Sequence, residues 1–106
     1  MKSIEEWCAY ITTWRKGKGF FTPDSIVGAN ADNMLGKLML VVSEVAEAAE
    51  AVRLYDLDNF KEELADATIR IFDICGAMSI DLEEAIRLKM QKNYQRPIRH
   101  GKQTNL

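Results

Sequence analysis

Apolar residues recur every three or four positions along most of this chain, which is the spacing that one face of an α-helix produces. Four such segments are predicted, at about residues 3–15, 31–54, 59–78 and 81–93. The pattern therefore predicts a single all-α domain that resembles a four-helix bundle and spans residues 1–106.

The ends of these segments carry recognisable signals. Ser3 with Glu6, and Asp81 with Glu84, have the spacing of capping boxes at the start of the first and fourth segments. Asp56 or Asp58 is expected to cap the third segment. Glycines and a Thr-Pro-Asp turn predict a flexible loop over 17–30, and Arg96-Pro97 predicts an irregular tail over 94–106.

Each of the last three segments has an apolar seam that is expected to form the core. In the second segment the stripe consists of Leu35, Leu38, Met39, Val42, Val45, Ala46, Ala49 and Val52. In the third it is Phe60, Leu64, Ala67, Ile71, Ile74 and Met78, and in the fourth Leu82, Ala85, Ile86 and Met90. Trp7 has core spacing in the first segment. Apolar residues off the main stripe, namely Leu40, Val41 and Ala48, predict that the chain forms at least a homodimer.

Composition limits the possible functions. A chain of 106 residues has room for one domain, and a net charge of −2 argues against a general binder of nucleic acid or of anionic membranes. Two cysteines, Cys8 and Cys75, lie in apolar periodic stretches and are interpreted as buried free thiols. No apolar run reaches the roughly 20 residues of a membrane span. A soluble, cytoplasmic protein is expected.

Four carboxylates at matched spacing are the main candidates for chemistry. Glu44 and Glu47 are three residues apart in one helical segment, and Glu63 and Asp66 are three apart in the next. Residues three apart project from nearly the same side of a helix, so a helical hairpin would bring all four together. Arg70 and Asp73 continue the acidic flank and are interpreted as a possible ion pair.

Ionised carboxylates share a small volume only when a counter-charge is present, and hard divalent cations prefer oxygen ligands. The chain has one histidine, His100, so iron and zinc are disfavoured and Mg²⁺ or Mn²⁺ is expected. Glu44 and Glu47, however, lie roughly opposite the apolar stripe of their helix. From spacing alone, four exposed carboxylates on solvated helix faces remain an open alternative.

The end of the chain is basic. From Arg87 to Lys102 it carries six Lys and Arg residues and no acid. An acidic middle followed by a basic end suits a metal together with a polyphosphate, although an ordinary charged tail explains the same pattern.

Three stretches resemble the MazG-like all-α nucleoside triphosphate pyrophosphohydrolases. They are KLMLVVSEVAEAAEAVR, FKEELADATIRIFDICG and IDLEEAIRLKMQKNYQRPIRHGK, and together they span roughly 35–102. The family signature is E-x-x-E followed by E-x-x-D, which the four acids match. Lys89, Asn93, Arg96 and Pro97 match the basic stretch that follows.

The resemblance implies a dimeric or tetrameric helical enzyme that uses Mg²⁺. It would cleave a nucleoside triphosphate between the α and β phosphates, giving a nucleoside monophosphate and pyrophosphate. Glu47, Glu63 and Asp66 would be the principal metal ligands, with Glu44 as a further ligand or as general base; Glu44 and Glu47 are the candidate catalytic residues.

Other residues are candidates for binding the nucleotide. Lys37, Lys89 and Arg96 are expected to contact the triphosphate, with Arg99 and Lys102 behind them, although solvated surface explains these charges too. Asn93 is either a helix cap or a substrate contact. Trp14 and Phe20 are candidates for stacking on the base.

Two other functional classes stay open. One is a related pyrophosphohydrolase acting on a different compound, such as phosphoribosyl-ATP. The other is a non-enzymatic helical oligomer that serves as an interaction module. The sequence selects neither the base nor the sugar of a nucleotide substrate.

Overall fold

Helices make up nearly all of the chain that the computed structural model describes, which is residues 1–19, 26, 30–96, 98–99 and 102–103. They are α1 (Ile4–Gly17), α2 (Asn30–Arg53), α3 (Leu57–Ala77) and α4 (Leu82–Gln95). Two short strands, β1 (Ile98–Arg99) and β2 (Lys102–Gln103), pair antiparallel near the end of the chain. The prediction of an all-α fold is confirmed.

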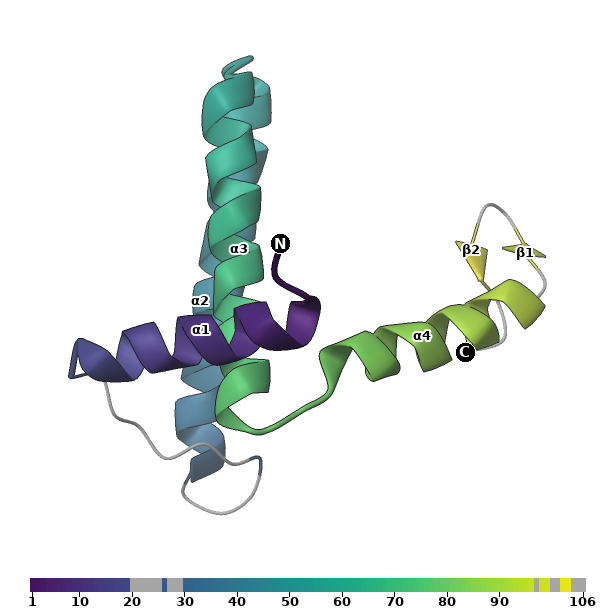
Figure 1. The fold of residues 1–106 in the computed structure, drawn as a ribbon. Helices are drawn as coiled ribbons and strands as arrows, with labels where there is room; N and C mark the ends of the chain where they lie inside the picture. The colour runs from purple at the N-terminus through teal and green to yellow at the C-terminus, as the bar shows by residue number, and fades with distance from the viewer. Residues whose placement is uncertain (20–25, 27–29, 97, 100–101, 104–106) are drawn as a thin grey trace.

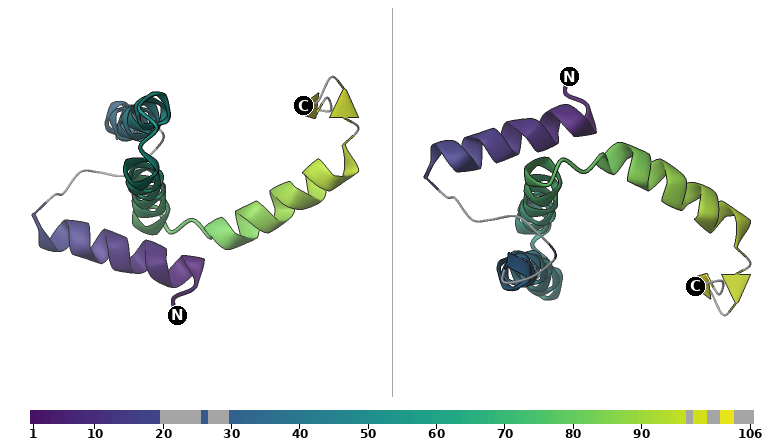
Figure 2. Two further views of the ribbon diagram at one scale, coloured as in Figure 1. Left: turned by 90° about the horizontal axis from the view of Figure 1, so that it is seen from above. Right: turned by 90° about the horizontal axis from the view of Figure 1, so that it is seen from below.

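The helices form a hairpin with two additions. Helices α2 and α3 lie side by side along their lengths, and α1 crosses the C-terminal half of α3 (Figure 1). Helix α4 leaves the end of α3 and points away from the hairpin, as both views in Figure 2 show. The radius of gyration is 16.1 Å, whereas a compact domain of this length has a value of about 13 Å.

Local signals place the helix ends within about two residues of their predicted positions. Ser3 and Glu6 form the predicted capping box of α1, and Asp56 caps α3 by accepting a hydrogen bond from the Asn59 amide. Asp81 caps α4, but the second half of the predicted box is wrong, because the Glu84 carboxylate pairs with Arg87 instead.

The predicted loop and tail have different outcomes. Gly17 and Asn30 belong to helices, and most of the predicted loop lies outside the described residues. The prediction of an irregular tail from residue 94 is wrong in two respects. Helix α4 continues to Gln95, and Ile98 pairs with Gln103 while Arg99 pairs with Lys102. The backbone becomes extended at Arg96, directly before the proline, which ends the helix and allows this pairing.

A close helix crossing joins α1 to α3. A Cβ atom added at Gly76 would lie 2.3 Å from Thr12 Oγ1 and 2.4 Å from the Cys8 carbonyl oxygen, so only glycine permits this approach. Cys8, Ile11 and Cys75 are buried around it, and both cysteines are free thiols, as predicted. Trp7, which was expected in the core, is exposed because α1 turns Cys8 and Ile11 toward α3 instead.

The predicted core stripe of α2 is the largest correction. Its large residues, Leu35, Leu38, Met39, Val42, Val45 and Val52, are 46–61% exposed. The face toward α3 instead buries Ala48 and Ala51, whose small side chains let the two backbones approach. Leu64 and Ile71 of the predicted α3 seam are likewise exposed, and α4 buries none of its residues. Two apolar faces are therefore uncovered in a single chain.

Among the helices of the described residues, none is both long enough and apolar enough to cross a lipid bilayer.

Candidate metal centre

Three of the four predicted acids meet where α2 packs on α3. One carboxylate oxygen from each of Glu44, Glu63 and Asp66 lies within 4.8 Å of the others. Glu47 is not part of this set; it is exposed, and its carboxyl lies within hydrogen-bonding reach of Glu63. The acids face one another because the alanine-lined side of α2 packs on α3, and Glu44 lies one helical turn before Ala48 on that side.

Glu63 is at the electrostatic centre of this group. The carboxyls of Glu47 and Glu44, together with partial desolvation, raise the pKa of Glu63 from its usual value of 4.5 to about 7. Its Oε2 atom is buried, and no described residue donates a hydrogen bond to it. When these carboxyls are all ionised, none can donate a hydrogen bond to another, and no positive group of the described residues donates one to this oxygen.

A divalent cation fits this arrangement. The ligand atoms are all carboxylate oxygens, and they converge from two helices. One of these carboxylates, that of Glu63, has a buried oxygen to which no described residue donates a hydrogen bond. Hard cations such as Mg²⁺ and Mn²⁺ take such ligands. Glu44, Glu63 and Asp66 are the residues placed to hold the ion, and Glu47 lies beside them.

Two arginines neutralise the neighbouring acids. Arg70 Nε donates a hydrogen bond to Glu44 Oε1 over 3.2 Å. Arg15 Nε lies 2.6 Å from Asp73 Oδ2, and the Thr12 hydroxyl contacts the Asp73 carbonyl oxygen and Oδ1, both at 3.0 Å. The interpretation of Arg70 and Asp73 as a pair is therefore wrong, because α2 supplies the partner of Arg70 and α1 supplies that of Asp73.

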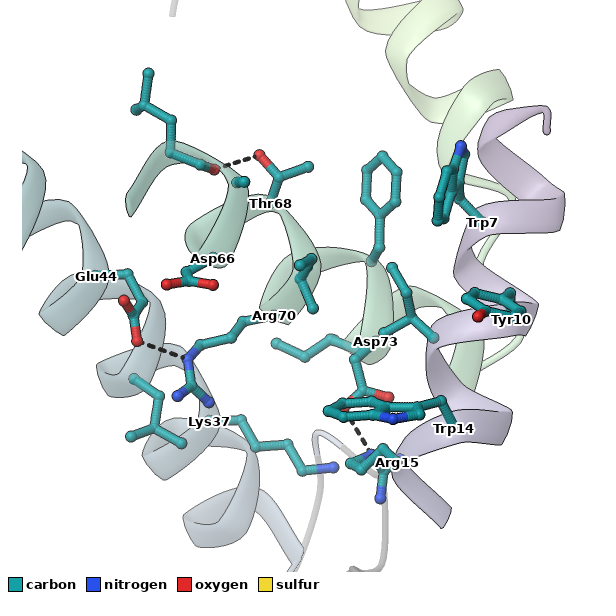
Figure 3. A pocket seen from close by; sticks show the side chains of 17 residues that line it. Trp7, Tyr10, Trp14, Arg15, Lys37, Glu44, Asp66, Thr68, Arg70 and Asp73 are labelled. Carbon is teal, nitrogen blue, oxygen red and sulfur yellow. Dashed lines mark hydrogen bonds and ion pairs between the residues drawn. The ribbon is translucent and has the colours of Figure 1, made fainter. Parts of the chain in front are cut away.

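An open groove of about 1260 Å³ runs from the acids toward α1. Glu44, Asp66 and Arg70 line one end, and Trp14, Arg15 and Asp73 line the other (Figure 3). The Lys37 side chain extends from α2 along the groove toward Arg15. The groove thus joins an acidic end to an aromatic and cationic end.

Residues 34–100, well over half of the chain, match the family model of the MazG nucleotide pyrophosphohydrolase domain. The chain belongs to this family. The matched region contains both acidic pairs and all of α3 and α4. No curated protein and no solved structure matches the chain significantly. Family membership supports nucleotide pyrophosphohydrolase activity in general and the use of a divalent metal.

The MazG domain does not bring every predicted binding residue to this groove within one chain. Lys37 and Trp14 line it, whereas three predicted residues lie outside it: Lys89 and Asn93 of α4, and Arg96, which directly follows this helix. Lys89 instead borders a small hollow on the apolar side of α4. Phe20 and His100, and the side chains of Arg99 and Lys102, lie outside the described residues.

Several residues that line the groove were not identified from sequence as binding residues. Tyr10 and Arg15 line the groove because α1 crosses α3, and no spacing within α1 signals that crossing. Arg70 and Asp73 did carry a signal, since they follow the predicted ligand Asp66 at positions i+4 and i+7, which fall on one helix face. That signal predicts a shared face but not which acid each arginine contacts.

Proposed function

We propose that this MazG domain hydrolyses nucleoside triphosphates between the α and β phosphates in a Mg²⁺-dependent reaction. The products are a nucleoside monophosphate and pyrophosphate. The observation that carries the proposal is the convergence of carboxylate oxygens from Glu44, Glu63 and Asp66 at one end of an open groove, together with a buried Glu63 oxygen that has no hydrogen-bond donor among the described residues.

The acidic end of the groove is the proposed place of reaction. Glu44, Glu47, Glu63 and Asp66 hold the metal, which when bound neutralises phosphate charge and makes water a better nucleophile. Glu44 or Glu47 accepts a proton from the attacking water. The water oxygen forms a bond to the α-phosphorus, and the bond from that phosphorus to the bridging oxygen breaks, so that pyrophosphate leaves.

The rest of the nucleotide is proposed to lie along α3 toward α1. Asp73 lies seven positions after Asp66, which is a rise of roughly 10 Å along a helix. That distance is of the size of a nucleotide between its phosphates and its base. Lys37 supplies a cation along the groove, and Trp14 supplies an aromatic surface for the base at the far end.

A homodimer or homotetramer is the proposed assembly. The exposed stripe of α2 and the uncovered apolar side of α4 are larger apolar surfaces than a monomer of this size usually shows. A second copy that covers them can also bring an α4 to each groove. Lys89, Asn93 and Arg96 would then contact the substrate held mainly by the other chain.

A pyrophosphate-release assay with Mg²⁺ tests this function across nucleoside triphosphates, their deoxy forms and phosphoribosyl-ATP. We expect monophosphate and pyrophosphate in equal amounts from at least one triphosphate. Release from phosphoribosyl-ATP alone would favour the related hydrolase. Release from no compound, with Mg²⁺ or Mn²⁺, would contradict the proposal and favour an interaction module.

The assay has a matched pair of variants on α2. Glu47→Gln should lower turnover at least about a hundredfold, the scale of losing a metal ligand or a general base. Glu50→Gln changes the same kind of side chain one turn later, where Glu50 is exposed and pairs with Arg53 outside the groove, so activity should be kept. Equal activity of the two variants would show that Glu47 is neither a metal ligand nor the general base.

A further inference from the structure

Arg70 is the cation already in contact with the acidic group. Its Nε atom lies 3.2 Å from Glu44 Oε1, and Glu44 is one of the three residues whose oxygens converge. The Arg70 side chain is 41% exposed and lines the groove, whereas the Glu44 side chain is 14% exposed. Arg70 therefore reaches from the open groove to a carboxylate of the candidate metal centre (Figure 3).

This contact is only a partial neutralisation. One guanidinium carries one positive charge and meets Glu44, while the buried Oε2 of Glu63 receives no donor from the described residues. A divalent cation among these oxygens would carry twice the charge and would repel the guanidinium at this short range. The two positive groups therefore compete for Glu44.

A guanidinium that is displaced from Glu44 can bind phosphate instead. A guanidinium carries five N–H donors in a planar fork that matches two oxygens of a phosphate group. Arg70 lies between Asp66 at the acidic end and Asp73 toward α1, on one face of α3. A triphosphate in this groove would pass beside it.

We propose that Arg70 exchanges partners during substrate binding. It holds Glu44 in the metal-free chain, releases this carboxylate to the metal, and then binds the phosphate groups of the nucleotide. This inference rests on the proposed function and assigns to it a positioning and phosphate-binding residue. The exchange keeps the acids close together before the metal arrives and makes metal and nucleotide binding support each other.

Calorimetry with Arg70→Gln tests the exchange through two binding constants. Mn²⁺ alone should bind several-fold more tightly than to the wild type, because a competing cation is gone. A non-hydrolysable α,β-methylene nucleoside triphosphate, added at saturating Mn²⁺, should bind about tenfold or more weakly, the usual loss for a charge-assisted hydrogen bond. Opposite signs in the two titrations are the expected result.

Two further variants make the result specific. Arg70→Lys keeps the charge without the fork, so Mn²⁺ affinity should stay near the wild-type value while the analogue binds with intermediate affinity. Arg53→Gln removes an exposed arginine that pairs with Glu50 on α2 away from the groove, and it should change neither constant. Helicity by circular dichroism confirms that each variant is folded.

Several outcomes would overturn the exchange. Weaker binding of both Mn²⁺ and the analogue would make Arg70 a support for Glu44 rather than its temporary partner. Unchanged binding constants in Arg70→Gln would show that Arg70 contacts neither the metal site nor the phosphates. A wild-type chain that binds no metal would show that Arg70 and a metal do not compete for Glu44. A wild-type chain that binds metal and analogue but releases no pyrophosphate contradicts the proposed function alone, and the Arg70 titrations still decide the exchange.

Discussion

At the residue scale, the candidate metal centre is defined by which acids have a positive partner. Glu44 is paired with Arg70 and Asp73 with Arg15, whereas the buried Oε2 of Glu63 has no donor among the residues described. The spacing of the acids predicted that they meet, because helical periodicity places them on facing sides. It did not predict these pairs, which depend on the way α1 and α2 approach α3.

Glu63 makes stability depend on pH in a direction that can be worked out. Its pKa is about 7 in the folded chain against a usual 4.5, so between these values the folded state holds a proton that the unfolded chain has lost. The contribution of Glu63 to the free energy of unfolding is therefore fully present below pH 4.5 and is lost as the pH rises through 7.

The prediction is a melting temperature, measured in EDTA, that falls more steeply from pH 4.5 to 7.5 in the wild type than in Glu63→Gln. Other groups titrate in both proteins, so the difference between the two curves is the readout. Added Mg²⁺ should flatten the wild-type curve, because the metal stabilises the ionised carboxylate. A curve for Glu63→Gln parallel to that of the wild type in EDTA would contradict the electrostatic account of the site.

At the element scale, local signals predicted helices well and their packing faces poorly. The caps at Ser3 and Asp56 place the starts of α1 and α3, because capping depends on neighbours in sequence. The apolar stripe of α2 was expected to form the core, yet the alanine-lined side is the one that packs on α3. Periodicity identifies an apolar face but not its partner, and here no described helix of the same chain covers that face.

The crossing of α1 and α3 gives a prediction about Gly76. Gly76→Ala should destabilise the fold by about 1–3 kcal/mol, the usual cost of overpacking, because the new methyl group meets Thr12 and the backbone of Cys8. Gly36→Ala in α2 is the matched control, since no atom lies within 4 Å of its added Cβ. Alanine there should stabilise the helix by about 0.5–1 kcal/mol.

Urea denaturation followed by circular dichroism measures both changes. A loss of stability at Gly36 equal to that at Gly76 would show that helix packing around Gly76 is not the cause.

At the scale of the whole molecule, the uncovered apolar faces are the main feature. The chain exposes 8148 Å² of surface, whereas a compact monomer of 12.1 kDa has about 6000 Å². Large apolar residues of α2 and α4 are exposed in one chain, among them Leu35, Met39, Ile86 and Met90. The proposed second copy, by covering these faces, would account for both the composition of the helices and the direction of α4.

Val42→Asp tests this assembly because Val42 is in the middle of the exposed α2 stripe. We expect the variant to be monomeric in sedimentation velocity at concentrations where the wild type is a dimer or tetramer, since burying an unpaired carboxylate is costly. Leu57→Asp places the same group on an exposed leucine at the start of α3, outside that stripe, and should leave the assembly intact. A wild-type chain that sediments as a monomer would refute the proposed assembly.

The most direct test of the metal centre is a titration of Mn²⁺ into the wild type and Asp66→Asn, followed by electron paramagnetic resonance of the free ion. Asp66 contributes one of the three converging oxygens, and an amide is a much weaker ligand than a carboxylate. We expect saturable binding to the wild type and a large loss of affinity in the variant. Equal binding by both proteins, or none by the wild type, would contradict a metal centre between α2 and α3.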